Sequence, residues 1–578
     1  MKHLAKYLKY YKLQVILGPI CKLIEALLEL TCPILVAKII DIGIATRDSA
    51  FIIKYGLIVI GITLLGFIFA ITCQKCASVA SSGIACKISG DMYSKINSFS
   101  HAEIDKFGTS SLLTRLTNDV NHIRLTFSRI IRQVTRVPFL LIGSIVLSIT
   151  INLKLSLVFL VVIPILTFVL IIFTKKTIPF FNLVRQKLDI VSRITRENLS
   201  GVRVIRAFNH QDQERERFFE ANDKLVKTQI GVGKITSLLN PIIYLIVDFA
   251  IIAILWFGGI EINVGALTQG ELIAFCNYMT TLSSALITTS TLYMTIVKST
   301  ACAHRINEIL FINPSIKFND KPVNLNNIEN QPILEFQNVG FSYDIQEKDP
   351  ERMFIKNLTF NLYQNQTIGI IGSTGAGKTT IANLVARFYD CNVGEILIYG
   401  KNIKEYPVKQ LRDIVSITQQ RSTLFSGSLR ENMQIRKNNA SDDEIISALK
   451  TSQAWDFVKD FPNQLDYKIM AGGKNVSGGQ MQRLTIARSL VGEPKILILD
   501  DSASALDFLT DLNLRKALKR DLNCATIIIS QRTTTIKNCD LIIVLDHGDV
   551  VGMGKHTDLI KSCSVYRETY ISQTQKEV

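Results

Sequence analysis

Long apolar stretches fill the first half of the chain and stop near residue 300. Two of them, Tyr55–Cys73 and Leu155–Phe173, hold 19 residues each without a charge, about the length that crosses a hydrocarbon core of ~30 Å. Four further stretches are less uniform: Leu13–Val36, which contains Lys22, Glu25 and Glu29, Val137–Leu153, Ile235–Ile260, which contains Asp248, and Leu272–Val297. This pattern predicts six membrane-spanning helices rather than the buried helices of a soluble core.

The second half of the chain has a different pattern, in which short apolar runs alternate with helical stretches. That alternation is typical of an α/β domain. The segment before it is rich in Asn, Pro and Lys and has no periodicity, so we expect a linker there. The predicted organisation is a transmembrane domain at 1–310, a linker at 311–332 and a soluble domain at 333–578.

Basic residues orient the predicted spans. The loops 74–136 and 174–234 contain nine and thirteen Lys or Arg residues, whereas the connections on the opposite side contain few. The positive-inside rule therefore places both long loops in the cytoplasm, together with the two termini and the soluble domain. The net charge of +16 follows largely from this topology, so it does not indicate binding to nucleic acid.

The two long loops are about sixty residues each and mostly helical in pattern. Helices that continue the spans would carry each loop roughly 40 Å from the membrane at ~1.5 Å per residue. We expect the tips of these loops to contact the soluble half, and the candidate tips are Glu103–Leu112 and Gly201–Phe208.

Three acidic residues, Glu25, Glu29 and Asp248, lie within predicted spans. Ionisable groups inside a membrane are candidates for function. Acidic groups that face a watery cavity would favour amphipathic cations as substrates. The alternative is an internal pair between Lys22 and Glu25, with the other groups exposed to water.

A glycine-rich loop, Gly372–Thr379, carries the strongest chemical signal in the soluble half. Its sequence, GSTGAGKT, follows an apolar strand-like run and opens a helix-like run, as a phosphate-binding loop requires. Backbone N–H groups and the helix N-terminus would face phosphate oxygens, while Lys378 reaches the β- and γ-phosphates and Thr379 binds Mg²⁺. Asp500, at the end of the apolar run Ile496–Asp500, supplies a carboxylate for the same metal. The loop therefore predicts binding of a nucleoside triphosphate.

Three motifs occur in a fixed order. The phosphate loop is followed about a hundred residues later by Ser477–Gln480, with the sequence SGGQ, and then by the run that ends in Asp500. This order resembles the exporters of the ATP-binding cassette (ABC) superfamily, in the half-transporter form, over essentially the whole chain. The resemblance implies a multidomain fold: a six-helix all-α transmembrane domain with long cytoplasmic helical loops, then an α/β P-loop nucleotide-binding domain with helical and antiparallel β subdomains. ATP and Mg²⁺ are the implied cofactors.

The resemblance also assigns roles to single residues. Tyr343 matches the aromatic residue that stacks on adenine, although a strand residue on a sheet face is the alternative. Gln420 matches the glutamine that touches Mg²⁺, so the implied metal-binding set is Thr379, Gln420 and Asp500. The implied ATP contacts are Tyr343, Gly372, Ser373, Thr374, Gly375, Ala376, Gly377, Lys378, Thr379 and Thr380 on this chain's own nucleotide, and Ser477, Gly478, Gly479 and Gln480 on the nucleotide of the opposite domain.

Two departures from the family pattern affect hydrolysis, and a third affects the connection between the signature and the membrane loops. Asp501 stands where the family usually has the glutamate that polarises the attacking water, and its carboxylate is set back by ~1.5 Å. Gln531 replaces the histidine that contacts the γ-phosphate, and an amide cannot become cationic. The stretch Tyr467–Gly473 lacks the acidic residues that are usual before the signature. The implied catalytic residues are therefore Asp501, Gln531 and Gln420. The first two differ from the residues that the family usually has at these positions.

The departures at Asp501 and Gln531 affect catalysis and leave the ATP-binding residues unchanged. The pattern resembles the degenerate-site subunit of bacterial heterodimeric multidrug-type exporters, which implies a multi-pass protein of a bacterial plasma membrane. The implied partners are a second ABC half-transporter, membrane lipids and a small amphipathic substrate that is drug-like or a lipid. Tolerated drift in a working site, a homodimeric lipid or peptide exporter, and a nucleotide-sensing regulatory or channel-like membrane protein are the alternatives.

Overall fold

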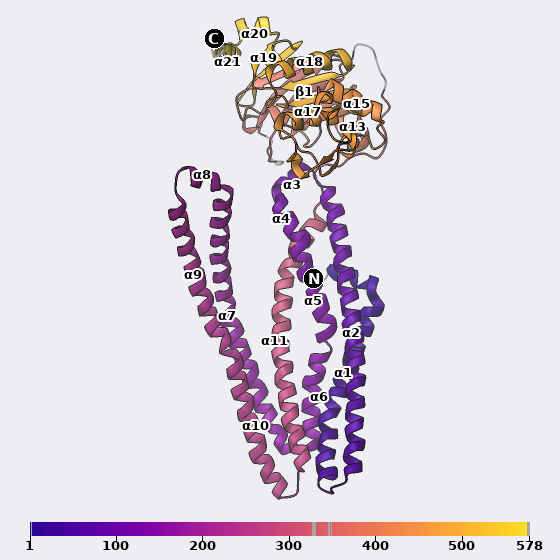
Figure 1. Cartoon of the computed structure of the whole chain (residues 1–578), viewed down its shortest axis with the longest axis vertical. Coiled ribbons are helices and arrows are strands. Elements are labelled where there is room, and N and C mark those ends of the chain that lie inside the picture. The colour runs from indigo at the N-terminus through magenta and orange to yellow at the C-terminus, as the bar shows by residue number, and fades with distance from the viewer. Residues whose placement is uncertain (2, 326–330, 345–346, 348, 575–578) are drawn as a thin grey trace. The chain divides into compact units, whose positions relative to one another are not determined.

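The chain folds into two compact units. The computed structural model describes residues 1, 3–325, 331–344, 347 and 349–574 (Figure 1). The first unit comprises Met1–Asn97 and Thr109–Ile312, and the second comprises Ser98–Gly108 and Asn313–Val578.

The first unit is helical wherever the structure describes secondary structure in it. Its long helices run without a break from the apolar stretches into the polar loops, since α2, α7 and α11 have 49, 48 and 43 residues. The elements are η1 (Leu4–Tyr11), α1 (Lys12–Lys38), η2 (Ile39–Ile44), α2 (Ser49–Asn97), α4 (Thr109–Thr114), η3 (Arg115–Asp119), α5 (Val120–Gln133), α6 (Arg136–Ile151), α7 (Leu153–Ser200), α8 (Val202–Ala207), α9 (Gln211–Ser237), α10 (Leu239–Asn263) and α11 (Gln269–Phe311).

Side-chain caps fix where two of the long helices begin. Asn152 accepts a hydrogen bond from the backbone N–H of Leu155 at 3.1 Å and so starts α7 directly after α6. Thr268 and Glu271 form a capping box at the start of α11. Both caps follow short connections on the side opposite to the long loops.

Five helical segments of the described chain are long and apolar enough to cross a membrane: Ser49–Asn97, Thr109–Ile151, Leu153–Ser200, Gln211–Asn263 and Gln269–Phe311. Helix α1 has 27 residues and stands outside this group because three charged residues, Lys22, Glu25 and Glu29, lie in its middle. The helical transmembrane region is therefore confirmed: five of the predicted spans are long and apolar enough to cross a membrane, and the sixth, Leu13–Val36, lies in α1 and is interrupted by charges.

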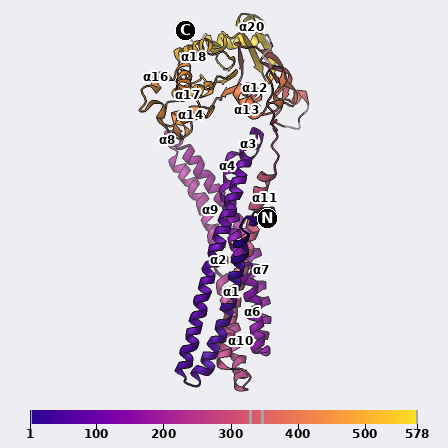
Figure 2. The ribbon, with the colours of Figure 1, turned by 90° about the vertical axis from the view of Figure 1, so that its right-hand side faces the viewer.

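Helix α11 runs through the middle of the first unit (Figure 1). Its Tyr278 is fully buried, and the hydroxyl donates a hydrogen bond to the Leu30 carbonyl of α1 at 2.8 Å. The pair α7 and α9, joined by the short helix α8, diverges from the other helices of the unit toward its α8 end (Figures 1 and 2).

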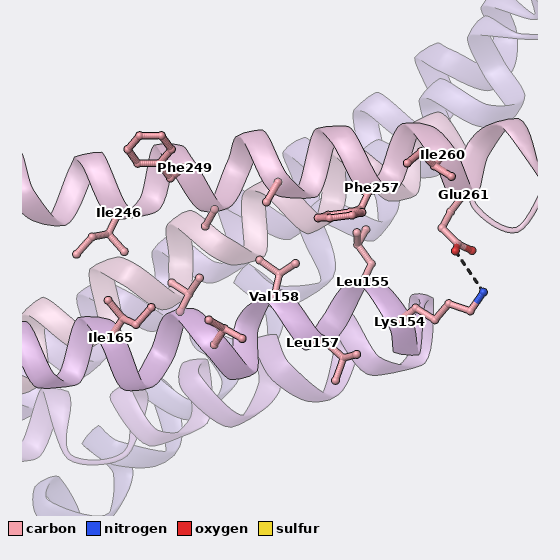
Figure 3. A pocket seen from close by; sticks show the side chains of 14 residues that line it. Lys154, Leu155, Leu157, Val158, Ile165, Ile246, Phe249, Phe257, Ile260 and Glu261 are labelled. Carbon is pink, nitrogen blue, oxygen red and sulfur yellow. Dashed lines mark hydrogen bonds and ion pairs between the residues drawn. The ribbon is translucent and has the colours of Figure 1, made fainter.

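An apolar groove lies between α7 and α10 (Figure 3). It has a volume of about 680 Å³, and its lining includes Val158, Ile165 and Phe249. An ion pair closes one end, where Lys154 Nζ lies 3.3 Å from Glu261 Oε1. Apart from this ion pair, the labelled side chains in the groove are hydrocarbon, as the membrane location of both helices requires.

The second unit is built on a mostly parallel six-stranded sheet in the order β12-β11-β3-β10-β9-β6. Its strands are β3 (Thr367–Gly372), β6 (Val415–Thr418), β9 (Ile496–Asp500), β10 (Ala525–Ile529), β11 (Leu541–Asp546) and β12 (Asp549–Gly554). Strand β12 pairs antiparallel at one edge, whereas the other strand pairs are parallel. The strands are almost wholly apolar, as expected for a sheet covered on both faces.

Two smaller sheets flank the central one. A four-stranded antiparallel sheet has the order β2-β1-β4-β5, and a two-stranded sheet pairs β7 with β8. Their strands are β1 (Leu334–Phe341), β2 (Ile355–Leu362), β4 (Val393–Ile398), β5 (Lys401–Asn402), β7 (Gly427–Ser428) and β8 (Lys468–Ile469). The α/β class and the antiparallel β subdomain are confirmed.

The helices of the second unit cover the sheets and form a helical subdomain. They are α3 (His101–Phe107), η4 (Pro350–Arg352), α12 (Lys378–Val385), η5 (Ile403–Glu405), α13 (Val408–Ile414), α14 (Leu429–Gln434), α15 (Asp442–Thr451), α16 (Trp455–Val458), η6 (Gln464–Asp466), η7 (Ala471–Gly473), α17 (Gly478–Leu490), α18 (Phe508–Asp521), α19 (Thr533–Ile536), α20 (His556–Ser562) and α21 (Ser564–Thr574).

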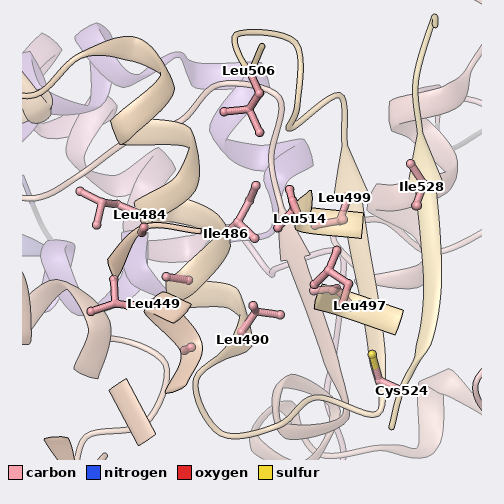
Figure 4. Packing of buried hydrophobic residues seen from close by; sticks show 14 of the residues in the cluster. Leu449, Leu484, Ile486, Leu490, Leu497, Leu499, Leu506, Leu514, Cys524 and Ile528 are labelled. Carbon is pink, nitrogen blue, oxygen red and sulfur yellow. The ribbon is translucent and has the colours of Figure 1, made fainter. Parts of the chain in front are cut away.

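One apolar cluster joins the helical subdomain to the central sheet (Figure 4). Leu449 of α15 and Leu484 of α17 pack with Leu497 of β9, and all three are fully buried. Full burial of a leucine contributes about 1.5–3 kcal/mol. The cluster therefore fixes α17 relative to the strand that ends in Asp500.

Helix α3, from the tip of the first long loop, packs on the second unit. The backbone N–H of Ser315 donates to Glu103 Oε1 at 3.0 Å, and the Tyr389 hydroxyl donates to the Asp105 carboxylate. The His101 ring stacks on Phe388 with centroids 4.2 Å apart, and burial lowers the pKa of His101. The expected contact of the first tip with the soluble half is found in this helix, whereas α8 belongs to the first unit.

Candidate functional site

The phosphate loop joins the end of β3 to the start of α12. Gly377 has a φ of +99°, and a Cβ there would lie 2.2 Å from Ile355 Cδ1. A Cβ on Gly372 would lie 2.3 Å from the Leu545 carbonyl oxygen. Both positions therefore require glycine, and the tight turn directs backbone N–H groups and the α12 N-terminus toward the same space.

Lys378 is the first residue of α12 and is 8% exposed. Its ammonium donates hydrogen bonds to the carbonyls of Gly372 at 2.8 Å and Ser373 at 2.6 Å. Burial lowers the pKa of Lys378, while the carboxylates of Asp500 and Asp501 oppose that shift. The loop thus holds the Lys378 ammonium over its concave face, where the positive charge attracts phosphate oxygens.

Asp500 ends β9 and is 2% exposed. Its carboxylate accepts a hydrogen bond from the Thr379 side chain, and burial raises its pKa. A hydroxyl and a carboxylate are hard oxygen ligands of the kind that Mg²⁺ prefers. Among the described residues no group of three or more His, Cys, Asp or Glu could hold a metal alone. Thr379 and Asp500 fit Mg²⁺, which usually takes one or two protein ligands and completes its shell with nucleotide phosphates and water.

A cavity of about 180 Å³ collects the loops that follow four parallel strands. Such a crevice at the carboxyl ends of parallel strands is the usual ligand site of this sheet type. Its lining is Phe354, Thr374, Gly375, Gly377, Lys378, Thr379, Thr380, Gln420, Asp500, Asp501, Ile529, Ser530 and Gln531. The structure therefore brings the predicted metal-binding and catalytic residues to one cavity, together with most of the phosphate loop.

Asp501 and Gln531 lie in this cavity after neighbouring strands. Asp501 has a φ of +47°, and its backbone N–H donates to the Ile529 carbonyl at 2.9 Å. Gln420 Nε2 donates to Asp501 Oδ2 at 3.5 Å. Burial raises the pKa of Asp501, and the hydrogen bond from Gln420 acts in the opposite direction. An acidic group is therefore present, and its short side chain lies at the limit of hydrogen-bond distance from Gln420.

Tyr343 lies just after β1 and is half exposed. Its hydroxyl shares a hydrogen bond of 2.9 Å with Thr380 Oγ1 of α12, and its ring lies 5.6 Å from that of Phe354. The predicted base-stacking residue thus lies beside the phosphate-loop helix. Phe354 was not predicted, because no motif marks it, and its place beside Gly377 becomes clear only from the fold.

Ser477–Gln480 occupies a different surface of the second unit and does not line this cavity. Ser477 caps α17 in a capping box: its hydroxyl accepts from the Gln480 N–H at 3.3 Å, and Gln480 Oε1 accepts from the Ser477 N–H at 2.9 Å. A Cβ on Gly478 would meet nothing within 4 Å. The start of α17 is an open helix N-terminus with the polarity that favours an anion.

The loop that precedes this surface contains Tyr467–Gly473. Its Gly472 N–H donates to the Leu424 carbonyl at 3.1 Å, and β8 within it pairs with β7. The unusual stretch therefore packs against the segment that follows Gln420.

The ionisable residues in the apolar helices are mostly paired. Lys22 Nζ lies 2.6 Å from Glu25 Oε2, and Arg136 Nη2 lies 2.7 Å from Glu29 Oε2. The internal Lys22–Glu25 pair is thus present, and Glu29 also has a cationic partner. Asp248 is exposed on α10.

Comparison with known proteins identifies the family to which this chain belongs. Two families match: ABC transporter transmembrane region over residues 15–286, and ABC transporter over residues 355–504. The chain is 34% identical to the uncharacterized ABC transporter ATP-binding protein YfiB of Bacillus subtilis, covering 100% of this chain and 99% of that protein. It is 30% identical to the ATP-dependent lipid A-core flippase of Desulfotalea psychrophila, covering 97% of each.

The fold also matches a solved structure, that of a bacterial Atm1-family ABC exporter with ATP bound. The TM-score is 0.79 at 23% identity, over 99% of this chain and 98% of that one. The transmembrane region and the ATPase domain are therefore arranged along one polypeptide as in an exporter. The chain belongs to the ABC transporter family, as a half-transporter with an exporter fold and an ATP-binding domain.

Proposed function

We propose that this chain is one half of an ATP-driven exporter of small amphipathic molecules, either drug-like compounds or lipids. Membership of the ABC transporter family, the apolar helices and the exporter fold support this proposal. ATP would be held by the phosphate loop and Tyr343, with Mg²⁺ at Thr379, Gln420 and Asp500. Binding of two ATP molecules between two such domains clamps them together, and hydrolysis releases them to alternate the access of the membrane pathway.

A second part of the proposal concerns the rate of hydrolysis at this chain's own site. It is based on one observation: an intact phosphate loop shares its cavity with Asp501 and Gln531. A displacement of about 1 Å at a catalytic group can cost about a hundredfold in rate. The aspartate loses ~1.5 Å of reach compared with a glutamate. The amide of Gln531 can donate a hydrogen bond but cannot supply a positive charge. We infer that this site binds ATP and hydrolyses it slowly.

The second ATP-facing surface leads to the proposed partner. Ser477, Gly478, Gly479 and Gln480 are all present at an open helix N-terminus. In our proposal they complete the hydrolytic site of a second, different half-transporter. A homodimer with two slow sites is the alternative arrangement.

The substrate class rests on the membrane half. Of the three acidic residues singled out in the predicted spans, Glu25 and Glu29 have cationic partners, so a cationic substrate is supported by Asp248 alone. The broader class of amphipathic molecules fits the apolar helices. One relative is described as a lipid A-core flippase, which supports a lipid as one member of that class.

The proposed topology has a direct test. We propose a transmembrane domain at 1–310, a linker at 311–332 and a nucleotide-binding domain at 333–578, with both termini and both long loops in the cytoplasm. Ser110→Cys and Ile205→Cys should react with a membrane-impermeant thiol reagent only after the membrane is opened. Reaction in intact cells would contradict the proposed orientation.

The test of function is ATPase activity with and without a second half-transporter. The purified chain should bind ATP and hydrolyse it poorly, whereas the co-expressed pair should show vanadate-sensitive hydrolysis that a transported compound stimulates. Ordinary turnover by the chain alone would refute the slow-site proposal. ATP binding without stimulated hydrolysis in any pairing would favour the regulatory or channel-like alternative.

A further inference from the structure

The last helix of the described chain holds the loop that carries Gln531. Gln573 of α21 accepts hydrogen bonds at Oε1 from both the N–H and the hydroxyl of Thr533, each at 2.8 Å. Its Nε2 donates to the Gln531 carbonyl at 2.8 Å. The amide orientation is fixed, because the Thr533 N–H can only donate and the Gln531 carbonyl can only accept.

Helix α21 does not depend on Gln573 for its place. Tyr566, two turns earlier on the same helix face, is fully buried in the apolar cluster that joins the helical subdomain to the central sheet. Its hydroxyl shares a hydrogen bond of 2.7 Å with His556 Nδ1 of α20. The helix is therefore anchored by packing, and the Gln573 amide is free to act on the neighbouring loop.

The loop held by Gln573 also contacts the loop after β9. Arg532 lies between Gln531 and Thr533, and its Nη2 donates to the Ser504 carbonyl at 3.1 Å. Hydrogen bonds continue from there to the signature helix α17. Gln482 Nε2 donates to Ser504 Oγ at 3.1 Å, and Gln482 Oε1 accepts from the Ala505 N–H at 3.0 Å.

These contacts link α21 to both ATP-facing surfaces. Gln531 lines the nucleotide cavity, and α17 starts at Ser477. A shift of the Gln531–Thr533 backbone would therefore act on this chain's own site directly and on the signature through Arg532 and Ser504.

We propose that Gln573 is a positioning residue, and that α21 is a latch that sets the Gln531–Thr533 loop and the signature helix together. This inference rests on the proposed function, which assigns ATP to both surfaces. At Gln531, we expect the backbone carbonyl that Gln573 binds to affect turnover more than the amide side chain does. Gln531→Ala should therefore change turnover less than Gln573→Ala does.

Hydrogen exchange of the full-length chain, followed by mass spectrometry, tests the contact itself. In Gln573→Ala the Thr533 amide should exchange about tenfold faster, because its acceptor is lost. In Gln573→Glu it should stay protected, since a carboxylate still accepts from Thr533. Ser572→Ala, at an exposed neighbour on α21, is the matched control and should exchange like the wild type.

Kinetics of the active transporter separate positioning from mere stability. Gln573→Ala and Gln573→Glu should both lower kcat severalfold, because both lose the hydrogen bond to the Gln531 carbonyl, with the KM for ATP changed by less than about twofold. Gln573→Ala leaves the buried Thr533 N–H without its acceptor, so its thermal unfolding should shift more than that of Ser572→Ala. The loss of kcat should nevertheless persist at temperatures well below the unfolding midpoint of every variant.

Three results would overturn the latch: wild-type exchange at Thr533 in Gln573→Ala, a loosened loop with unchanged kcat, or faster exchange throughout the domain. Wild-type ATP binding, measured in the same preparation, is a separate test. Its absence would refute the proposed function, while the exchange comparison would still decide whether Gln573 holds the loop.

Discussion

The nucleotide-binding domain has two surfaces that we propose to face ATP, and they differ in how closely their residues follow the expected family pattern. The first is the cavity around Lys378, where Asp501 and Gln531 stand in place of a glutamate and a histidine. The second is the start of α17, where Ser477–Gln480 has the family's usual residues. Both use a helix N-terminus and glycine backbone to favour anions. The difference lies in the groups that would act on water and on the γ-phosphate.

In our proposal, binding and hydrolysis depend on separate atoms. Binding would use backbone N–H groups, the Lys378 ammonium and the Thr379 hydroxyl, which tolerate a change elsewhere in the cavity. Hydrolysis needs a carboxylate at one particular distance, because only interactions that strengthen in the transition state raise the rate. One domain can therefore keep ATP on one surface and support turnover on the other.

The largest expected effect is on the second surface. Ser477→Ala removes a hydroxyl that we expect to stabilise the partner's γ-phosphate. Loss of one such donor costs about 10²- to 10³-fold in turnover. The measurement is ATPase activity of the transporter assembled with its second subunit.

Ser441→Ala is the matched control for Ser477→Ala. Ser441 caps α15 in the same kind of capping box with Glu444, away from the ATP-facing surfaces. Both substitutions should cost a similar free energy of unfolding, typically ~1 kcal/mol. Equal loss of ATPase activity in the two variants would show that Ser477 acts through helix stability alone.

The next effect is on nucleotide affinity at the first surface. Lys378→Ala removes the ammonium that we expect to contact the β- and γ-phosphates. Hydrogen bonds to charged groups contribute about 1.5–3 kcal/mol, so the Kd for ATP should rise about 10- to 100-fold. Lys516→Ala, at an exposed lysine on α18, should bind like the wild type. Wild-type affinity in Lys378→Ala would refute the phosphate-loop assignment.

Restoring the usual catalytic pair sharpens the comparison. The double variant Asp501→Glu with Gln531→His should raise turnover of a homodimer by about tenfold or more, since both of its sites regain the missing groups. A heterodimer should change little, because its working site lies on the partner's phosphate loop. Steady-state ATPase measurements on both assemblies distinguish the two arrangements.

The smallest effect is expected for Asp501→Ala in the heterodimer. If the shortened side chain has already cost most of the rate, its removal should lower turnover by less than about threefold. A loss as large as that of Ser477→Ala would show that Asp501 is a working catalytic residue, and the two surfaces would then be equivalent.

Much of the fold could be predicted from the sequence, because its signals are local. Charge-free runs of 19 residues and the alternating apolar runs after residue 333 correspond to helices and to a parallel sheet. The Lys22–Glu25 pair was one of two alternatives that their spacing allowed, and contact of the first loop tip with the soluble half was expected. The partners in that contact, Ser315 and Tyr389, could not be foreseen, because they lie more than 200 residues along the chain from Glu103 and Asp105.

The candidate site was predictable where a motif fixes its position in the chain. The phosphate loop, Gln420, Asp500, Asp501 and Gln531 meet in one cavity. Phe354 and Gln573 have no motif, because each reaches the site only through folding of a distant strand or helix. The left-handed backbone of Asp501 could not be foreseen either, since it depends on the turn between β9 and the following loop.

The most direct test of the slow site is the chemical state of the nucleotide bound to this chain. The transporter would be incubated with a photoreactive ATP labelled on the α-phosphate, crosslinked after several turnovers, and its subunits separated before the bound nucleotide is analysed. The account predicts mostly uncleaved ATP on this chain while the partner carries ADP. ADP on this chain at the partner's rate would contradict it.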